Sequence, residues 1–275
     1  MRISRTLRAS ITVGLIGAFV GCAPGGSGAG DARSDVQKPR DARPAARTET
    51  NRYASAEGLP EKPALDGITI VVGNPAAHST VQVYEDPRCP VVEEYERTGA
   101  EALQKLLLMG EIKAEYTLAS FKDDRLGGDG SKRAVNALRA ALQEGKFVEY
   151  HGVLFENQIA VESSGGFTTE RLLKLAEKVP GLRSEAFDQA VRTMQYRSFV
   201  AASQRTYQQT GVDPIGPGTP TIVVNGHNID GGLYGANFDA ALFRHLVIDL
   251  HENPETWDSV YKPLKKKMEA EAAES

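Results

Sequence analysis

The residue in this sequence with the clearest chemical potential is Cys89, which stands between Arg88 and Pro90. A cysteine thiolate is a nucleophile that can attack a disulfide and form a mixed disulfide with it. Arg88 is a candidate to stabilise such a thiolate if its side chain turns toward the sulfur. Cys22 is the other cysteine of the 275 residues, so the chain has no multi-disulfide framework.

The residues around Cys89 predict a strand before it and a helix after it. Residues 80–84 alternate apolar and polar side chains, which is the period of a β-strand. Pro90 suits the first turn of a helix, where a missing N–H costs nothing. Apolar residues then recur at helical spacing until Gly110, where we expect the helix to end. Cys89 would therefore stand at the N-terminus of a helix, whose dipole favours the thiolate.

A second landmark is the apolar segment from Thr219 to Gly226. Pro220, which opens it, cannot donate a hydrogen bond to a neighbouring strand, so its position needs a special reason. The plain interpretation is a trans proline at the start of a strand. Asn225 and Gly226 favour a tight turn, after which residues 227–230 would return as a paired strand.

The remaining periodicities predict an α/β arrangement. Residues 112–118 alternate again, so strand, helix and strand form a βαβ unit with parallel pairing. Before this unit, a hairpin-like connection at 73–78 follows an apolar run at 68–72. Between 123 and 211 the apolar residues recur at helical spacing. We expect four helices there, the last a long one from Ser184 to Gly211.

These features together resemble the DsbA-like proteins of the thioredoxin superfamily. The family pattern G-N-P-x-A, an apolar strand and D-x-x-C-P-x-C is matched in order by Gly73, Asn74, Pro75, Ala77, Asp86, Cys89 and Pro90. A later run from Gly145 to Gln158 resembles the family's G-K-F … L-F-x-N-Q segment. We interpret its aromatic residues as core packing.

The resemblance covers residues 67–250 and implies a thioredoxin-like α/β fold with an inserted helical bundle. It implies further that the Thr219–Pro220 bond is cis and that this loop lies against the active-site cysteine. Pro90, Thr219 and Pro220 would then contact the substrate. For this family the substrate is a protein or peptide that carries thiols or disulfides.

One departure from the family pattern limits the thiol reactions that the protein can carry out. The second cysteine of the motif would fall at Val92, so Cys89 has no internal partner and a DsbA-type intramolecular disulfide is excluded. Three functions stay open. The protein is a monothiol redox protein whose mixed disulfides an external thiol resolves, a binding module without redox turnover, or a thiol transferase or peroxidase for small molecules. In a binding module, Cys89 would be a buried small hydrophobic residue.

The N-terminus carries an export signal. Residues 1–21 combine three arginines with a short apolar run and end in small residues before Cys22. This end resembles a bacterial lipobox, so we expect Cys22 to carry lipid and to anchor the protein at the extracytoplasmic face of the cell membrane. The alternative is a secreted protein with an incidental cysteine.

The composition divides the rest of the chain into three parts. Residues 22–60 have almost no large apolar side chains and predict a disordered linker. Residues 61–255 form the thioredoxin-like domain, with its helical insertion at 123–211. Residues 256–275 are a charged C-terminal tail.

Composition also excludes some classes of partner. The formal net charge is -4 with both signs interspersed, so we expect no nucleic-acid partner. The five histidines are scattered without the spacing of metal ligands, so we expect no metal site and no cofactor.

Overall fold

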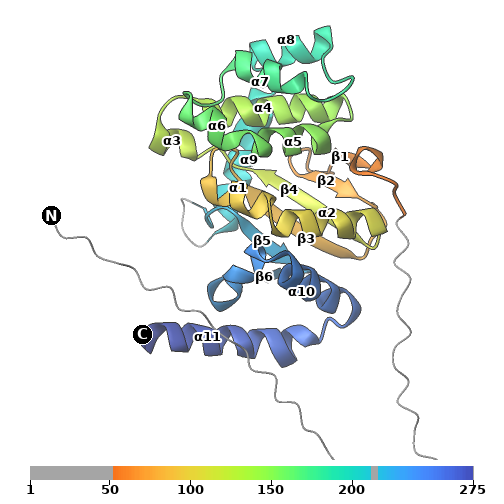
Figure 1. Cartoon of the computed structure of the whole chain (residues 1–275), viewed down its shortest axis with the longest axis vertical. Helices are drawn as coiled ribbons and strands as arrows, with labels where there is room; N and C mark the ends of the chain where they lie inside the picture. Colours follow the sequence, from red (N-terminus) through yellow and green to blue (C-terminus); the bar gives the residue numbers. More distant parts are fainter. Residues whose placement is uncertain (1–51, 212–215, 275) are drawn as a thin grey trace, which may run out of the picture. The chain divides into compact units, whose positions relative to one another are not determined.

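The computed structural model of the chain describes residues 52–211 and 216–274 (Figure 1). The predictions for the export signal and for Cys22 lie outside the described residues. Among the helices that are described, none is both long enough and apolar enough to cross a lipid bilayer.

A six-stranded mixed sheet organises the described residues. Its strands, in the order in which they lie side by side, are β1 (Glu61–Pro63), β2 (Ile70–Gly73), β4 (Ile112–Leu118), β3 (Ser79–Glu85), β5 (Thr221–Val224) and β6 (His227–Asn228). β3 and β4 run parallel, and the other neighbouring pairs are antiparallel. The parallel pair confirms the predicted βαβ unit, and the β5–β6 pair confirms the predicted return after Gly226.

The predicted hairpin before the βαβ unit is wrong. β2 and β3 do not pair with each other, because both pair with β4, which lies between them. Gly73 and Ser79 lie beside Lys113 and Ile112 at the start of β4. The side-chain amide of Asn74 donates to the carbonyl oxygen of Gly110 at 2.8 Å. The connection therefore passes across the start of β4 and does not close a turn.

The helix predicted from Cys89 onward is divided into α1 (Pro90–Glu96) and α2 (Gly99–Met109). Between them, Thr98 leaves the helical conformation, with φ -134° and ψ -89°. Gly99 then approaches Asn237 so closely that a Cβ at this position would lie 2.2 Å from the Asn237 carbonyl oxygen. This tertiary contact requires glycine and fixes the place of the break.

The described residues between β4 and β5 form the helical insertion. Its helices are α3 (Lys122–Leu126), α4 (Gly130–Gln143), α5 (Phe147–Glu156), α6 (Gln158–Ser163), α7 (Thr169–Ala176), α8 (Glu185–Thr193) and α9 (Arg197–Thr210). The predicted start at Ser184 is confirmed, because its hydroxyl accepts a hydrogen bond from the Phe187 N–H at 3.0 Å. The single long helix predicted from there is wrong, since Met194 adopts a left-handed conformation (φ 52°) that ends α8.

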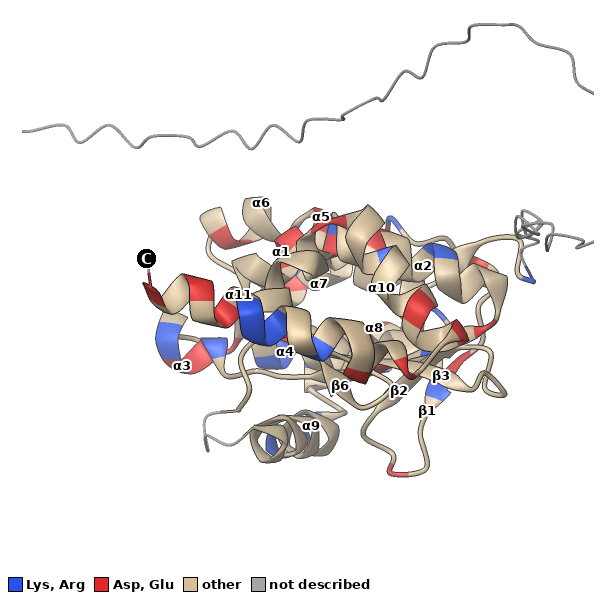
Figure 2. Ribbon diagram, turned by 90° about the horizontal axis from the view of Figure 1, so that it is seen from below, with Lys and Arg blue, Asp and Glu red and all other residues tan. Residues whose placement is uncertain are grey.

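Helices cover both faces of the sheet. Figure 2 shows α2 and α10 (Ala240–Glu252) on one side of the strands and α9 on the other. On the α9 side, the Leu118 N–H donates to the Ser203 hydroxyl at 3.0 Å, and the Ser120 N–H donates to Gln204 Oε1 at 2.6 Å. The end of β4 is therefore fixed by α9, which belongs to the insertion.

The folded part begins earlier than the predicted boundary at residue 61. The N–H groups of Arg52 and Tyr53 both donate to the Leu108 carbonyl oxygen, at 2.8 and 3.0 Å. A 3₁₀ turn, η1 (Ala56–Gly58), follows, and Leu59 after it is buried in the core. Residues 52–60 are therefore part of the domain and not of the predicted linker.

The folded part also continues beyond residue 255, where the sequence predicts a charged tail. The additional elements are η3, a π-helical turn (Trp257–Tyr261), and α11 (Lys262–Glu274), and α11 packs on η2, a 3₁₀ segment of the domain (Gly231–Phe238). The buried Tyr261 donates its hydroxyl proton to Asp249 Oδ2 at 2.7 Å, and Lys265 forms an ion pair with Asp230. These contacts hold α11 beside η2.

Candidate functional site

Cys89 is the N-cap residue of α1, as the sequence predicts. It is buried, with 2% of its surface exposed. Its thiol donates to the carbonyl oxygen of Thr219, 3.3 Å from the sulfur. Val92 and Phe155 pack against it on the apolar side. The thiol therefore has one polar neighbour and two large apolar ones.

The loop opposite Cys89 contains a cis peptide bond between Thr219 and Pro220. The N–H of Gly218 donates to the hydroxyl oxygen of Tyr207 at 3.0 Å, so α9 holds this loop in place. Burial raises the pKa of Tyr207 to about 12, and its hydroxyl stays protonated at neutral pH. The hydroxyl oxygen of Thr219 is buried and has no hydrogen-bond partner among the described residues.

A groove of about 410 Å³ opens beside Cys89. The residues that line it come from α1, the start of the insertion, α9 and the cis-proline loop: Cys89, Val91, Phe121, Lys122, Arg125, Tyr207 and residues 216–219. The rings of Phe121 and Tyr207 stack at a centroid distance of 5.3 Å. The cations of Lys122 and Arg125 lie 5.6 and 5.7 Å from the Phe121 ring. The groove thus offers aromatic surface and positive charge next to the thiol.

The cis-proline loop also borders a second hollow, of about 340 Å³. Thr219 and its neighbours line both hollows, and Asp230 and Tyr234 line the second. A polypeptide segment lying along the loop could therefore extend from one hollow into the other. Of the predicted substrate-binding residues, Thr219 and Pro220 line these hollows. Pro90 is exposed at the start of α1, and its neighbour Val91 lines the groove.

Asp86 fixes the turn that presents Cys89. Its carboxylate accepts hydrogen bonds from the Arg88 N–H (3.0 Å), the Ser131 hydroxyl (2.7 Å) and the Lys122 N–H (2.9 Å). Burial raises the pKa of this carboxyl to about 6, although the three hydrogen bonds favour its charged form. Ser131 stands in the first turn of α4, and Lys122 begins α3. The turn is therefore tied to the insertion.

Gln158 supports the same turn from α6. Its buried side-chain amide donates to the carbonyl oxygens of Pro87 and Cys89, at 3.0 and 2.8 Å. One side chain thus bridges the Pro87 carbonyl and the carbonyl of the N-cap residue Cys89, which also accepts the Val92 and Glu93 N–H groups. A buried amide with both donors engaged holds its partners in a defined geometry.

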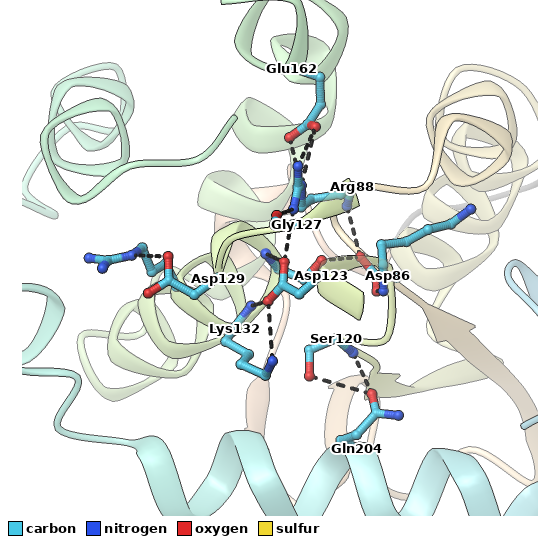
Figure 3. Close-up of polar contacts among 12 residues, drawn as sticks. Asp86, Arg88, Ser120, Asp123, Gly127, Asp129, Lys132, Glu162 and Gln204 are labelled. Atoms are coloured by element: carbon cyan, nitrogen blue, oxygen red, sulfur yellow. Dashed lines mark hydrogen bonds and ion pairs between the residues drawn. The ribbon is translucent and has the colours of Figure 1, made fainter. Parts of the chain in front are cut away.

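The Arg88 side chain turns into the insertion (Figure 3). Its guanidinium forms ion pairs with Asp123 (3.0 Å) and Glu162 (3.1 Å) and donates to the Gly127 carbonyl oxygen at 2.9 Å. Asp123 and Arg88 are buried, so their charges compensate each other away from water. The predicted role of Arg88 as thiolate stabiliser required its side chain to turn toward the sulfur. Its charge is instead matched by two carboxylates.

A second polar cluster, formed by Glu85, Glu96 and His151, contacts Phe155. The Nε2 atom of His151 lies 2.5 Å from Glu85 Oε1, and Nδ1 lies 3.7 Å from Glu96 Oε2. Burial raises the pKa of Glu96. Burial alone would lower the pKa of His151, but the two carboxylates outweigh it and raise that pKa. The His151 ring packs at 4.9 Å from Phe155, which in turn touches Cys89.

Sequence reasoning did not assign Phe155, Gln158 or Tyr207 to the site. Phe155 and Gln158 belong to the L-F-x-N-Q run, and that resemblance was the signal that could have found them. Tyr207 stands in an amphipathic helix, where an aromatic residue on the apolar face is usually core. Its contact with the cis-proline loop depends on tertiary packing.

A family model described as thioredoxin matches residues 66–242, which is more than half of the chain. The chain belongs to the thioredoxin family. None of the curated proteins matches it.

Three solved structures are similar to this thioredoxin-family protein. The thiol-disulfide oxidoreductase MdbA from Corynebacterium diphtheriae has a TM-score of 0.54 and 19% identity, over 71% of this chain and 100% of MdbA. BdbD from Bacillus subtilis in its oxidised form has a TM-score of 0.55 and 22% identity, over 66% and 92% of the two chains. MdbA from Actinomyces oris has a TM-score of 0.56 and 21% identity, over 68% and 87%. The shared architecture confirms the DsbA-like thioredoxin fold with a helical insertion.

Proposed function

We propose that this protein carries out thiol–disulfide exchange on polypeptides through its single active-site cysteine, Cys89. The observation that carries the proposal is the position of the thiol, which meets the cis-proline loop at Thr219 and lines the open groove. A polypeptide lying along the loop would bring a sulfur of its own to Cys89. The two MdbA proteins named above are thiol-disulfide oxidoreductases. Their fold, which this chain shares, supports the same general class of chemistry.

The single cysteine limits the reaction to exchange. The Cys89 thiolate attacks one sulfur of a substrate disulfide, forms a mixed disulfide with it, and releases the other substrate sulfur as a thiolate. The thiolate of another molecule then attacks the substrate sulfur of the mixed disulfide, forms a new disulfide with it, and returns Cys89 as a thiolate. The number of disulfides is unchanged, so no oxidant is consumed. Val92 stands where a resolving cysteine would lie, and the second attack therefore comes from outside.

A second candidate function is a polypeptide-binding module without redox turnover. The observation that favours it is the burial of Cys89, whose sulfur is enclosed by Val92 and Phe155. A buried free cysteine commonly acts as a small hydrophobic residue. In this case the groove and the cis-proline loop would bind extended chain, and Cys89 would fill space.

Mixed-disulfide trapping distinguishes the two functions. The full-length chain with Cys22→Ser has Cys89 as its one thiol. Incubated under native conditions with a symmetrical peptide disulfide, it should gain the mass of one peptide half at Cys89, and an added small thiol should remove it. The matched control carries Cys89→Ser as well. A native chain that stays unmodified, while the same chain reacts in urea, would reject exchange. Binding of a reduced, unfolded polypeptide to the double variant would then establish the module.

We propose in addition that Cys22 carries lipid and holds the domain at the extracytoplasmic face of the cell membrane. The support is the sequence of residues 1–22, with its arginines, short apolar run and small residues before the cysteine. Expression of the precursor and of its Cys22→Ala form in a bacterial host tests this. The parent should enter the detergent phase of a phase-partition extraction, and the variant the aqueous phase. Recovery of both in the aqueous phase would leave a secreted protein.

A further inference from the structure

Three polar side chains from three separate elements meet inside the domain. Glu85 is the last residue of β3, Glu96 is the last residue of α1, and His151 lies in α5. One donor atom from each lies within 4.8 Å of the donor atoms of the other two. Glu85 and His151 are buried, and Glu96 has 12% of its side chain exposed. Their separation along the chain hides this group from any search for ligand spacing.

The cluster holds more acceptor atoms than its own donors satisfy. Glu85 Oε2 and Glu96 Oε1 are buried and have no hydrogen-bond partner among the described residues. The hydroxyl oxygen of Tyr95, the neighbour of Glu96, is unpartnered in the same way. A buried carboxylate oxygen without a partner costs free energy. Both unpaired carboxylate oxygens belong to the same cluster, which points to a cation bound within it.

The distances around the imidazole fit a metal ion better than a direct contact with Glu96. His151 Nε2 lies 2.5 Å from Glu85 Oε1, a hydrogen-bond distance that fixes the orientation of the ring. His151 Nδ1 lies 3.7 Å from Glu96 Oε2, which is too long for a hydrogen bond. Two ligands at zinc distances and a tetrahedral angle lie about 3.4 Å apart. The space between Nδ1 and Oε2 therefore matches two atoms that share one ion.

A cavity of about 270 Å³ reaches the cluster from the surface. Glu96 and His151 line it, together with exposed Arg97 and the aromatic residues Tyr116 and Phe155. It gives an ion a route to the ligands, which a metal site needs. It is separate from the groove beside Cys89, which shares none of these lining residues.

We propose that His151 Nδ1 and Glu96 bind one divalent transition-metal ion, with Zn²⁺ as the type, while Glu85 holds the imidazole through Nε2. A carboxylate and an imidazole that is oriented by a second carboxylate suit zinc and its first-row neighbours, whereas Mg²⁺ and Ca²⁺ prefer oxygen ligands alone. The two carboxylate charges match the charge of the ion. A bound ion would join α1 to α5, and so fix the insertion to the helix that Cys89 begins.

Zinc titration of the thiol-free full chain, with Cys22→Ser and Cys89→Ser, tests the site. Calorimetry with ZnCl₂ on chelator-treated protein should show one equivalent bound per chain. Glu96→Gln keeps the shape of the side chain but removes a ligand charge, and should weaken zinc binding by at least about 100-fold, as loss of a ligand exceeds loss of its supporting contacts. Glu94→Gln, on an exposed residue of the same helix, is the matched control and should bind as the parent does.

Anomalous scattering at the zinc edge from crystals of the parent grown with Zn²⁺ locates the ion without any variant at the site. A peak between His151 Nδ1 and Glu96 supports the proposal even if Glu96→Gln does not fold. A peak elsewhere, the absence of stoichiometric binding, or equal affinity of Glu96→Gln and Glu94→Gln would each overturn it. The cluster would then be a hydrogen-bonded pair of acid and imidazole. The outcome is independent of thiol exchange, because the tested chain has no thiol.

Discussion

The sulfur of Cys89 lies 3.3 Å from the carbonyl oxygen of Thr219, although 130 residues separate them in the chain. This contact joins the start of α1 to the cis-proline loop, the two segments that carry the family resemblance. On its apolar side the sulfur meets Val92, one turn along α1, and Phe155 from the insertion. Three distant parts of the chain therefore make the surroundings of one thiol, and a substitution can test each of them.

Val92→Cys should convert the protein into a dithiol enzyme. Val92 is fully buried and packs with Cys89, and the substitution recreates the C-P-x-C spacing across the first turn of α1. We expect the oxidised variant to contain a disulfide between Cys89 and the introduced cysteine, and to oxidise a reduced peptide, whereas the parent forms mixed disulfides without oxidation. Thiol counting and peptide mass spectrometry measure both.

The matched control for this variant is Val91→Cys, which places a thiol on the same helix outside the C-x-x-C spacing. It should not oxidise the peptide. Turnover by the parent itself without added thiol would show that the missing cysteine is not limiting. If Val92→Cys gains nothing, the groove has changed in more than its second cysteine, and the binding-module function gains support.

Phe155→Ala should both expose Cys89 and destabilise the domain. Phe155 is buried and covers the sulfur, and truncation of a buried Phe costs about 3–5 kcal/mol. Urea unfolding measures the loss of stability. In the native Cys22→Ser chain, Phe155→Ala should make alkylation of Cys89 by iodoacetamide several-fold faster. Phe187→Ala, at an equally buried position of α8 in the insertion, serves as control. If it accelerates alkylation equally, global opening and not local cover controls access.

Arg88→Ala should be severely destabilising. It leaves the carboxylate of Asp123, whose side chain is 1% exposed, without its arginine partner. Breaking a buried ion pair in this way costs about 3–5 kcal/mol. Urea unfolding again provides the measurement. Arg97→Ala removes an arginine that is 62% exposed and paired with Glu93, and should cost less than about 1 kcal/mol. Equal losses for the two variants would contradict the structural role of Arg88.

The predictable parts of this fold are the ones that local chemistry decides. Pro90 and the apolar spacing after it place Cys89 at a helix start, and Asn225 with Gly226 forms the turn between β5 and β6. Both depend on neighbouring residues alone. The sequence also carries the family motifs, from which the cis-proline loop and the insertion follow by resemblance.

The unpredictable parts depend on residues that meet only in the folded chain. Periodicity continues through Thr98, and the break there comes from the approach of Gly99 to Asn237. Arg88 can turn toward the sulfur or away from it, and Asp123 and Glu162, which decide this, follow it by 35 and 74 residues. The cluster of Glu85, Glu96 and His151 was equally unpredictable, because β3, α1 and the insertion each supply one of its residues.

Gly232→Ala should loosen α11, the helix that the sequence presents as a charged tail. A Cβ at Gly232 would lie 2.7 Å from both the Lys265 carbonyl oxygen and the Met268 Cβ, and backbone oxygen cannot move aside as a flexible side chain can. Overpacking of this kind costs about 1–3 kcal/mol. Limited proteolysis should then cleave within α11 faster than in the parent.

Gly235→Ala, in the same segment but with no atom within 4 Å of the added Cβ, should leave cleavage unchanged. Equal protection of both variants would mean that α11 does not depend on this contact. Because η2 also carries Tyr234 to the hollow beside the cis-proline loop, a loosened α11 should weaken polypeptide binding there as well.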